Sequence, residues 1–197
     1  MNIIRGAKII YWGVPRTGSR YVFQRLLEAY ESDAAGVDSE HQYRRTHVHA
    51  IDWDPEFADY GVVCSVRNPY WRALSGWKWL NGARSSLGKS GCNSFDDYVR
   101  RVMPHAILPV TVELGQLIEK VDYVIHLEDC ERDLKKIPYF PADLEFPPNT
   151  YASSYRLTPK EYYADKKIAG RVWECYREDF ETFGYARDSY MEISGDR

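Results

Sequence analysis

Two short segments of this chain contain the residue types that bind phosphate groups. The first, residues 13–20, reads GVPRTGSR and lies between an apolar run and a helical pattern. Backbone N–H groups and the positive end of a helix dipole would there converge on one anion. Its glycines have the GxxxxG spacing of a nucleotide-binding loop, but Ser19 stands where lysine is required, and Arg20 where Ser or Thr is required. With its cation at Arg16, the loop is expected to bind a phosphorylated ligand other than magnesium ATP.

The second segment, residues 61–77, reads GVVCSVRNPYWRALSGW. Its apolar start is typical of a buried parallel strand, and its Asn-Pro pair is typical of a helix start. Arg67 stands at the expected end of the strand, and Ser75 lies in the expected helix. Because one comes from a strand end and the other from the following helix, the two side chains are expected to converge on one phosphate.

Taken together, the two segments resemble the sulfotransferases that use 3′-phosphoadenosine 5′-phosphosulfate (PAPS), most closely the carbohydrate-type branch with the heparan and uronosyl enzymes. The family pattern P-[KR]-x-G-[ST]-[ST/R] is matched by PRTGSR at residues 15–20. The pattern V-R-[ND]-P-x-x-R-x-x-S is matched by VRNPYWRALS at residues 66–75. Residues 123–134 and 175–185 are similar to the family's late strand and C-terminal helix, so the resemblance touches most of the chain.

This resemblance implies a donor, PAPS, and a product, adenosine 3′,5′-bisphosphate, with no metal because arginines supply the counter-charge. The residues implied to hold the 5′-phosphosulfate are Pro15, Arg16, Thr17, Gly18, Ser19, Arg20 and Tyr21. Those implied to hold the 3′-phosphate are Arg67 and Ser75, with Arg156 in a later loop. Arg16 matches the family's catalytic cation, usually lysine. Arginine stabilises negative charge but hardly donates a proton, so only the electrostatic role is carried over.

A general base must take the proton of the acceptor. His47 and His49 have strand-like spacing on one face, and histidine accepts protons near neutral pH. The resemblance to uronosyl sulfotransferases implies that His47 is the base and His49 its neighbour. Asp52 and Glu40 remain alternatives, as in members that use a carboxylate. Two further histidines stand in helix-end and strand contexts and are interpreted as structural: His105 and His126.

Composition indicates one compact domain over residues 1–197. The chain is 44% hydrophobic and 28% charged, and its net charge of −3 gives no overall basic field for nucleic acid. The four cysteines lack metal-type spacing and are expected to be free thiols in a reducing compartment. The absence of a long apolar run or a signal peptide leads us to expect a cytoplasmic protein without membrane contact.

Strands alternate with helices along the chain. Strands are predicted at residues 8–13, 61–67 and 122–127, with a short segment around 47–52. Helices are predicted at residues 18–31, 69–82, 94–103, 111–120 and 129–137, with another starting near Thr158 and the last ending at Gly184. This order predicts an α/β fold, a P-loop-like three-layer arrangement with a central parallel sheet flanked by helices. Residues 32–46, 83–93 and 138–157 are expected to be loops.

Two other functions compete with sulfuryl transfer. A kinase for nucleotides or small molecules is disfavoured by the missing lysine, and a non-catalytic nucleotide-binding module is disfavoured by the presence of Arg16, Arg67 and Ser75. The sequence leaves open the acceptor, expected to be a carbohydrate or small molecule with a hydroxyl group, and the oligomeric state.

Overall fold

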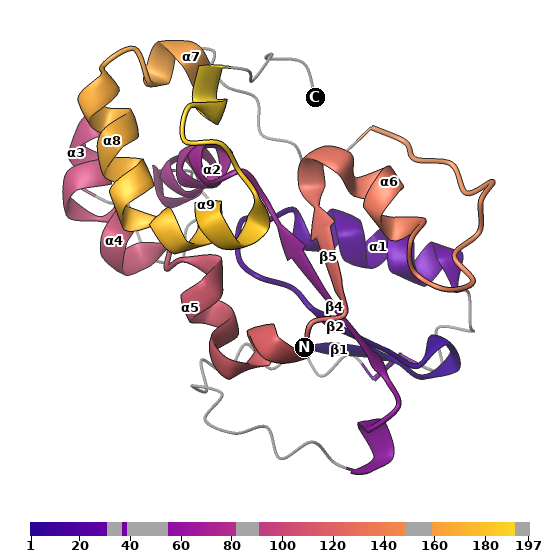
Figure 1. Ribbon diagram of the computed structural model, residues 1–197. Helices are drawn as coiled ribbons and strands as arrows, with labels where there is room; N and C mark the ends of the chain where they lie inside the picture. Colours follow the sequence, from indigo (N-terminus) through magenta and orange to yellow (C-terminus); the bar gives the residue numbers. More distant parts are fainter. Residues whose placement is uncertain (31–36, 39–54, 82–90, 149–158, 192–197) are drawn as a thin grey trace. The chain divides into compact units, whose positions relative to one another are not determined.

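The computed structural model of the protein describes residues 1–30, 37–38, 55–81, 91–148 and 159–191 (Figure 1). It is an α/β fold with an open, mixed sheet. The chain divides into two compact units. The first comprises Met1–Val66 and Leu114–Pro148, and the second comprises Arg67–Glu113 and Asn149–Arg197. The single domain expected over residues 1–197 stays a prediction.

The first unit contains the sheet, with strand order β3-β1-β2-β4-β5. The strands are β1 (Asn2–Ile4), β2 (Ile9–Trp12), β3 (Val37–Asp38), β4 (Gly61–Val66) and β5 (Tyr123–His126). β2, β4 and β5 run parallel, with Ile10 opposite Val62 and Ser65 opposite Ile125. The predicted strands at 8–13, 61–67 and 122–127 are therefore confirmed to within a residue or two.

The expected central parallel sheet is confirmed for β2, β4 and β5, but the sheet as a whole is mixed. β1 pairs antiparallel with both β2 and β3, and β3 lies inside the loop expected at 32–46. The single turn of 3-10 helix η1 (Arg5–Ala7), followed by Lys8 in the left-handed region, reverses the chain between β1 and β2. Strands of two and three residues are too short to show the alternation that identifies a strand in a sequence.

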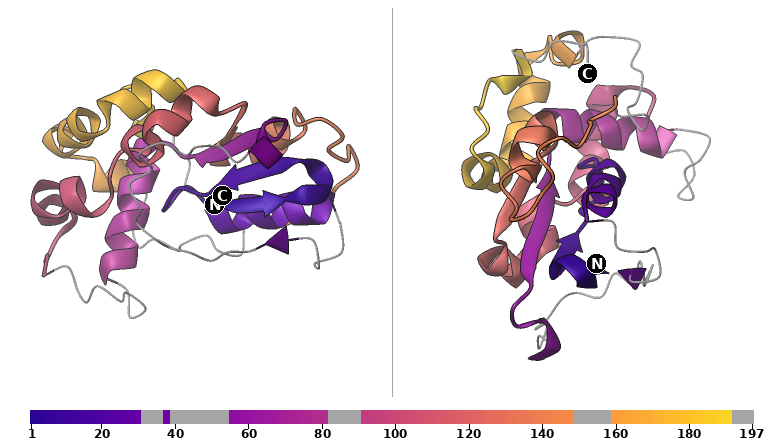
Figure 2. Two further views of the ribbon diagram at one scale, coloured as in Figure 1. Left: turned by 90° about the horizontal axis from the view of Figure 1, so that it is seen from below. Right: turned by 90° about the vertical axis from the view of Figure 1, so that its right-hand side faces the viewer.

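One helical layer of the first unit covers one face of the sheet. It is formed by α1 (Ser19–Ala29) and α6 (Cys130–Leu134), which follows the 3-10 helix η5 (Leu127–Asp129). Their apolar side chains share one buried cluster with the strands, and Figure 2 shows α1 alongside the sheet. The members of this cluster on the helices include Tyr21, Val22, Leu26, Cys130 and Leu134, and those on the strands include Ile9, Tyr11, Val63 and Ile125.

The second unit is helical. Its elements are α2 (Pro69–Asn81), α3 (Phe95–Arg101), α4 (Met103–Ala106), α7 (Pro159–Tyr162), α8 (Lys166–Cys175), α9 (Arg177–Phe183) and the 3-10 helix η6 (Ser189–Met191). The predicted start of a helix at residue 94 is confirmed, because Ser94 caps α3 by accepting a hydrogen bond from the Asp97 N–H. Gly184 ends α9 in the left-handed region, also as predicted.

Two predicted helices are shorter than expected. Instead of one helix over 111–120, the chain forms α5 (Val110–Leu114) followed by the 3-10 helix η4 (Gly115–Lys120), and Gly115 has φ +53°. The helix predicted at 129–137 ends at Leu134 as α6. None of the helices in the described ranges is long and apolar enough to cross a membrane.

A buried ion pair organises the core of the second unit. The Arg72 side chain is fully buried, and its Nη1 lies 3.6 Å from Asp179 Oδ2. Asp179 also accepts hydrogen bonds from the N–H groups of Val110, at 2.8 Å, and Thr111, at 2.9 Å. Arg72, the remaining arginine of the second motif, is therefore a structural residue that joins α2 to α9 and the start of α5.

Candidate phosphate-binding site

The first predicted phosphate loop lies at the carboxyl end of a parallel strand. Residues 13–18 connect β2 to α1, and β4 and β5 continue the parallel part of the sheet beside β2. Ligands of open α/β sheets bind outside the carboxyl ends of such strands. The strand–loop–helix arrangement expected from residues 9–27 is thus present.

The start of α1 has no side-chain cap. Its N-cap, Gly18, has no side chain to accept a hydrogen bond, and the first turn contains no acidic residue. Helices α3 and α8, by contrast, are capped by the side chains of Ser94 and Asp165. The first N–H groups of any helix lack intrahelical partners and carry partial positive charge. This end of α1 is therefore suited to an anion, and the positive side chain of Arg20 in its first turn adds to that.

Buried hydroxyl groups hold the loop against the sheet. Thr17 is fully buried and donates from Oγ1 to the Val14 carbonyl at 2.8 Å. Because this uses the threonine proton, the 2.8 Å contact between Ser65 Oγ and Thr17 Oγ1 must have Ser65 as its donor. The Tyr11 hydroxyl lies 2.8 Å from Ser65 Oγ and 3.1 Å from the Ser19 carbonyl. Burial raises the pKa of Tyr11, so this hydroxyl stays protonated.

This hydroxyl network ties the loop to two parallel strands at once, because Tyr11 belongs to β2 and Ser65 to β4. Neither Tyr11 nor Ser65 was predicted from the sequence to belong to the site. A signal was present in the polar Ser65 within an otherwise apolar strand, since a buried hydroxyl requires a partner. The Thr17 hydroxyl expected to reach the phosphate instead supports the loop.

Two residues of the loop have left-handed backbone conformations. Arg16 is half-buried with φ +70°, and Gly18 has φ +75°. A left-handed conformation costs a residue with a Cβ atom roughly 1–2 kcal/mol, whereas glycine adopts it freely. At Gly18, a Cβ atom would in addition overlap the side chain of Leu127, the residue after β5. Glycine at this position therefore allows the segment after β5 to pack against the loop.

The remaining predicted ligands of the loop differ in how they are placed. Pro15 and Arg20 are exposed, and Ser19 is half-buried. Tyr21 is buried in the core of the first unit, where its hydroxyl donates to the Pro147 carbonyl at 3.0 Å. Its N–H donates to the Gly18 carbonyl at 2.9 Å, so the first helical hydrogen bond starts there.

Arg67 and Ser75 belong to the second unit. The Arg67 guanidinium carbon lies 5.5 Å from the ring centroid of Trp71, and Ser75 is buried within α2 with 3% of its surface exposed. Arg67 follows β4 directly in the chain, as predicted. Their shared contact with one phosphate stays a prediction. The predicted residues that lie outside the described ranges are Glu40, His47, His49, Asp52 and Arg156.

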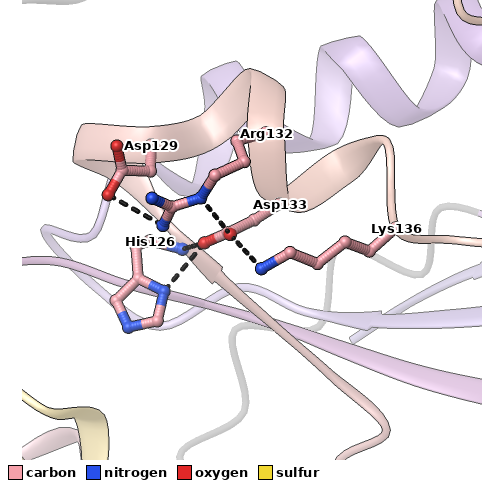
Figure 3. A network of polar contacts seen from close by, with 5 residues as sticks. All are labelled: His126, Asp129, Arg132, Asp133 and Lys136. Carbon is pink, nitrogen blue, oxygen red and sulfur yellow. Dashed lines mark hydrogen bonds and ion pairs between the residues drawn. The ribbon is translucent and has the colours of Figure 1, made fainter.

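A histidine and an aspartate form a hydrogen-bonded pair at the carboxyl end of β5 (Figure 3). Asp133 Oδ2 accepts from the backbone N–H of His126 at 3.0 Å and lies 2.8 Å from His126 Nδ1. The other carboxylate oxygen accepts from Lys136 at 2.7 Å and from Arg132 Nε at 3.3 Å. From its sequence context His126 was interpreted as structural, and no pattern in the sequence pointed to Asp133.

Burial would raise the pKa of the Asp133 carboxyl, but hydrogen bonds outweigh it and lower the pKa to about 2. They come from Lys136 and from the backbone and ring of His126. The Asp133 side chain is 1% exposed and ionised at neutral pH, whereas that of His126 is 27% exposed. The pair thus consists of a buried, ionised Asp133 carboxylate and a partly exposed His126 imidazole.

Comparison with protein-family models, with curated proteins and with solved structures finds no match in any of the three. Within the described ranges, no group of three or more His, Cys, Asp or Glu side chains is placed to hold a metal ion.

Proposed function

We propose that this protein is a sulfotransferase that moves a sulfuryl group from PAPS to a hydroxyl group of a carbohydrate or another small molecule. The observation that carries the proposal is the loop between β2 and α1. The N-terminus of α1 has no side-chain cap, and its first turn contains no acidic residue. Arg16 places a positive charge inside the loop, at a position where the loop of an NTPase has no cation. This loop suits a phosphorylated ligand that binds without magnesium.

The residues of the loop have separate roles in this proposal. Backbone N–H groups at the start of α1 hold the 5′-phosphate, with Thr17 contributing through its N–H because its hydroxyl supports the loop. During transfer, the acceptor oxygen forms a bond to sulfur while the bond from sulfur to the bridging oxygen breaks. The electron pair of that bond leaves with the phosphate, and Arg16 stabilises the developing charge.

The segment at residues 66–75 supplies the second half of the proposal. Arg67 follows β4, the strand next to the one that leads into the loop, and it has the motif's spacing to Ser75. In the proposed complex, Arg67 and Ser75 hold the 3′-phosphate, which PAPS has and ATP lacks. The three-layer, P-loop-like architecture is part of this proposal, and so are the predicted roles of His47, His49 and Arg156.

The experiment that tests this function compares ligands by thermal stabilisation, because a ligand that binds only the native state raises its stability. Adenosine 3′,5′-bisphosphate is expected to stabilise the protein without metal, and ATP with magnesium is not. The opposite order would favour a kinase. Stabilisation by neither ligand would contradict nucleotide binding altogether.

Arg67→Ala sharpens the test, because the 3′-phosphate is the group it is proposed to bind. A hydrogen bond to a charged group is worth about 1.5–3 kcal/mol, so the variant should bind the bisphosphate about 10- to 100-fold more weakly. Its affinity for adenosine 5′-monophosphate should stay within about twofold of the wild type. Arg177→Ala is a matched control from the same unit, since Arg177 also stacks on a tryptophan, at 4.5 Å from the Trp173 ring centroid. An equal loss for both nucleotides in Arg67→Ala would refute the assignment.

A further inference from the structure

His126 of the His126–Asp133 pair precedes the residue that packs against the proposed phosphate loop. His126 is the last residue of β5, and its neighbour Leu127 packs against Gly18, the N-cap of α1. The pair is therefore connected to the loop by one residue. These residues all belong to the first unit, whose parallel strands end at this edge.

The geometry fixes which nitrogen of the imidazole carries the proton. Asp133 Oδ2 lies 2.8 Å from His126 Nδ1, and the carboxylate is ionised, so it can only accept. Nδ1 must be the donor, and in the neutral imidazole Nε2 then holds the lone pair. The second hydrogen bond, from the His126 backbone N–H to the same oxygen, fixes the carboxylate relative to the ring.

From this arrangement we propose that His126 is the proton acceptor for the group that attacks sulfur, with Asp133 as its positioning residue. The proposal rests on the proposed sulfotransferase function. It replaces the structural interpretation of His126, and it assigns to His126 the role of base that the sequence predicted for His47. As the acceptor oxygen bonds to sulfur, its proton passes to His126 Nε2, and the phosphate departs with the electron pair of the broken bond. Asp133 holds the ring in the required tautomer and stabilises the imidazolium that results.

Further charged groups lie on the elements that carry the pair and the loop. Lys136 and Arg132 offset the charge of Asp133 through its other oxygen. The charged side chains of the elements around His126 in the first unit are Glu128 and Asp129 on η5, Arg132, Asp133 and Lys136 on α6, and Arg16 and Arg20 at the loop. Because these groups also carry charge, the pH dependence of the wild-type rate must be compared with that of His126→Asn.

His126→Asn separates the chemical role from the structural one. The asparagine amide can still donate to Asp133 from near the position of Nδ1, but it has no basic nitrogen in place of Nε2. The assay is the release of labelled sulfate from PAPS with water as the acceptor, since the natural acceptor is unidentified. We expect a rate at least about 100-fold lower than in the wild type, with affinity for adenosine 3′,5′-bisphosphate within about twofold.

The pH profile gives a readout that a structural role would not move. In the wild type the rate should rise with pH as the imidazole loses its proton, and this rise should be absent in His126→Asn. An unchanged rate in His126→Asn overturns the proposal, as does full loss of activity in His47→Ala or His49→Ala alone. Wild-type protein that binds the bisphosphate yet releases no sulfate also overturns it.

Nitrogen-15 NMR tests the tautomer without any ligand, with His126→Asn giving the assignment. A proton on Nδ1 is expected, and a proton on Nε2 in the neutral ring would refute the inference. Failure of adenosine 3′,5′-bisphosphate to stabilise the wild type overturns the sulfotransferase function and with it this role. Stabilisation by that nucleotide with normal turnover in His126→Asn overturns only the role of His126.

Discussion

Because buried hydroxyl groups support the phosphate loop, we predict that Thr17→Val lowers the free energy of unfolding. The substitution keeps the shape of the side chain but removes the hydroxyl that donates to the Val14 carbonyl and accepts from Ser65. Ser65 retains Tyr11 as a partner at 2.8 Å, so the group left unsatisfied is the buried carbonyl of Val14. Leaving a buried polar group unpaired costs about 1–3 kcal/mol, and we expect a loss of about 2 kcal/mol.

Urea unfolding at neutral pH measures this loss as a change in the midpoint at constant slope. Ser65→Ala is expected to cost less, about 1 kcal/mol, because Thr17 keeps the Val14 carbonyl and Tyr11 keeps the Ser19 carbonyl as partners. The double variant tests the shared hydrogen bond, since residues in contact are not additive. A Thr17→Val protein within about 0.5 kcal/mol of the wild type would refute the network as a source of stability.

Two further predictions concern the same unit. Arg16→Gly should have a free energy of unfolding about 1 kcal/mol higher than that of Arg16→Ala, because glycine adopts the φ of +70° without steric cost. Both variants should lose turnover in the sulfate-release assay. Equal stability of the two variants would contradict a left-handed Arg16. For Asp133, a folded-state pKa lowered to about 2 stabilises the native state above the unfolded pKa of about 4, and this contribution is lost as pH falls toward 2. The free energy of unfolding of Asp133→Asn should therefore be about 2 kcal/mol lower than that of the wild type at pH 7, and this difference should shrink below pH 4. A difference that does not change between pH 7 and pH 3 would count against an ionised Asp133.

Much of the fold could be predicted from the sequence, because its main signals are local. Apolar runs of four to six residues identified β2, β4 and β5, and Ser94 and Gly184 marked helix ends by their own chemistry. Strands β1 and β3 escaped prediction because their place in the sheet depends on pairing with β2 and β1 rather than on any pattern of their own.

The candidate site was predictable where its residues stand close together in the chain. The loop at residues 13–20 has a recognisable spacing of glycine and arginine, and the structure gives it the expected setting between β2 and α1. The Tyr11–Ser65 hydrogen bond joins residues 54 positions apart, and no local pattern pairs them. His126 and Asp133 are seven residues apart across a strand end and a helix start, a separation that has no fixed geometry until both elements are placed.

The proposed function requires that one nucleotide binds with a phosphate at each of the two motifs. A crystal structure of the protein with adenosine 3′,5′-bisphosphate tests this most directly. We predict the 5′-phosphate at the backbone N–H groups that begin α1 and the 3′-phosphate at the Arg67 guanidinium. A nucleotide bound away from the loop, or with its 3′-phosphate turned from Arg67, would contradict the account.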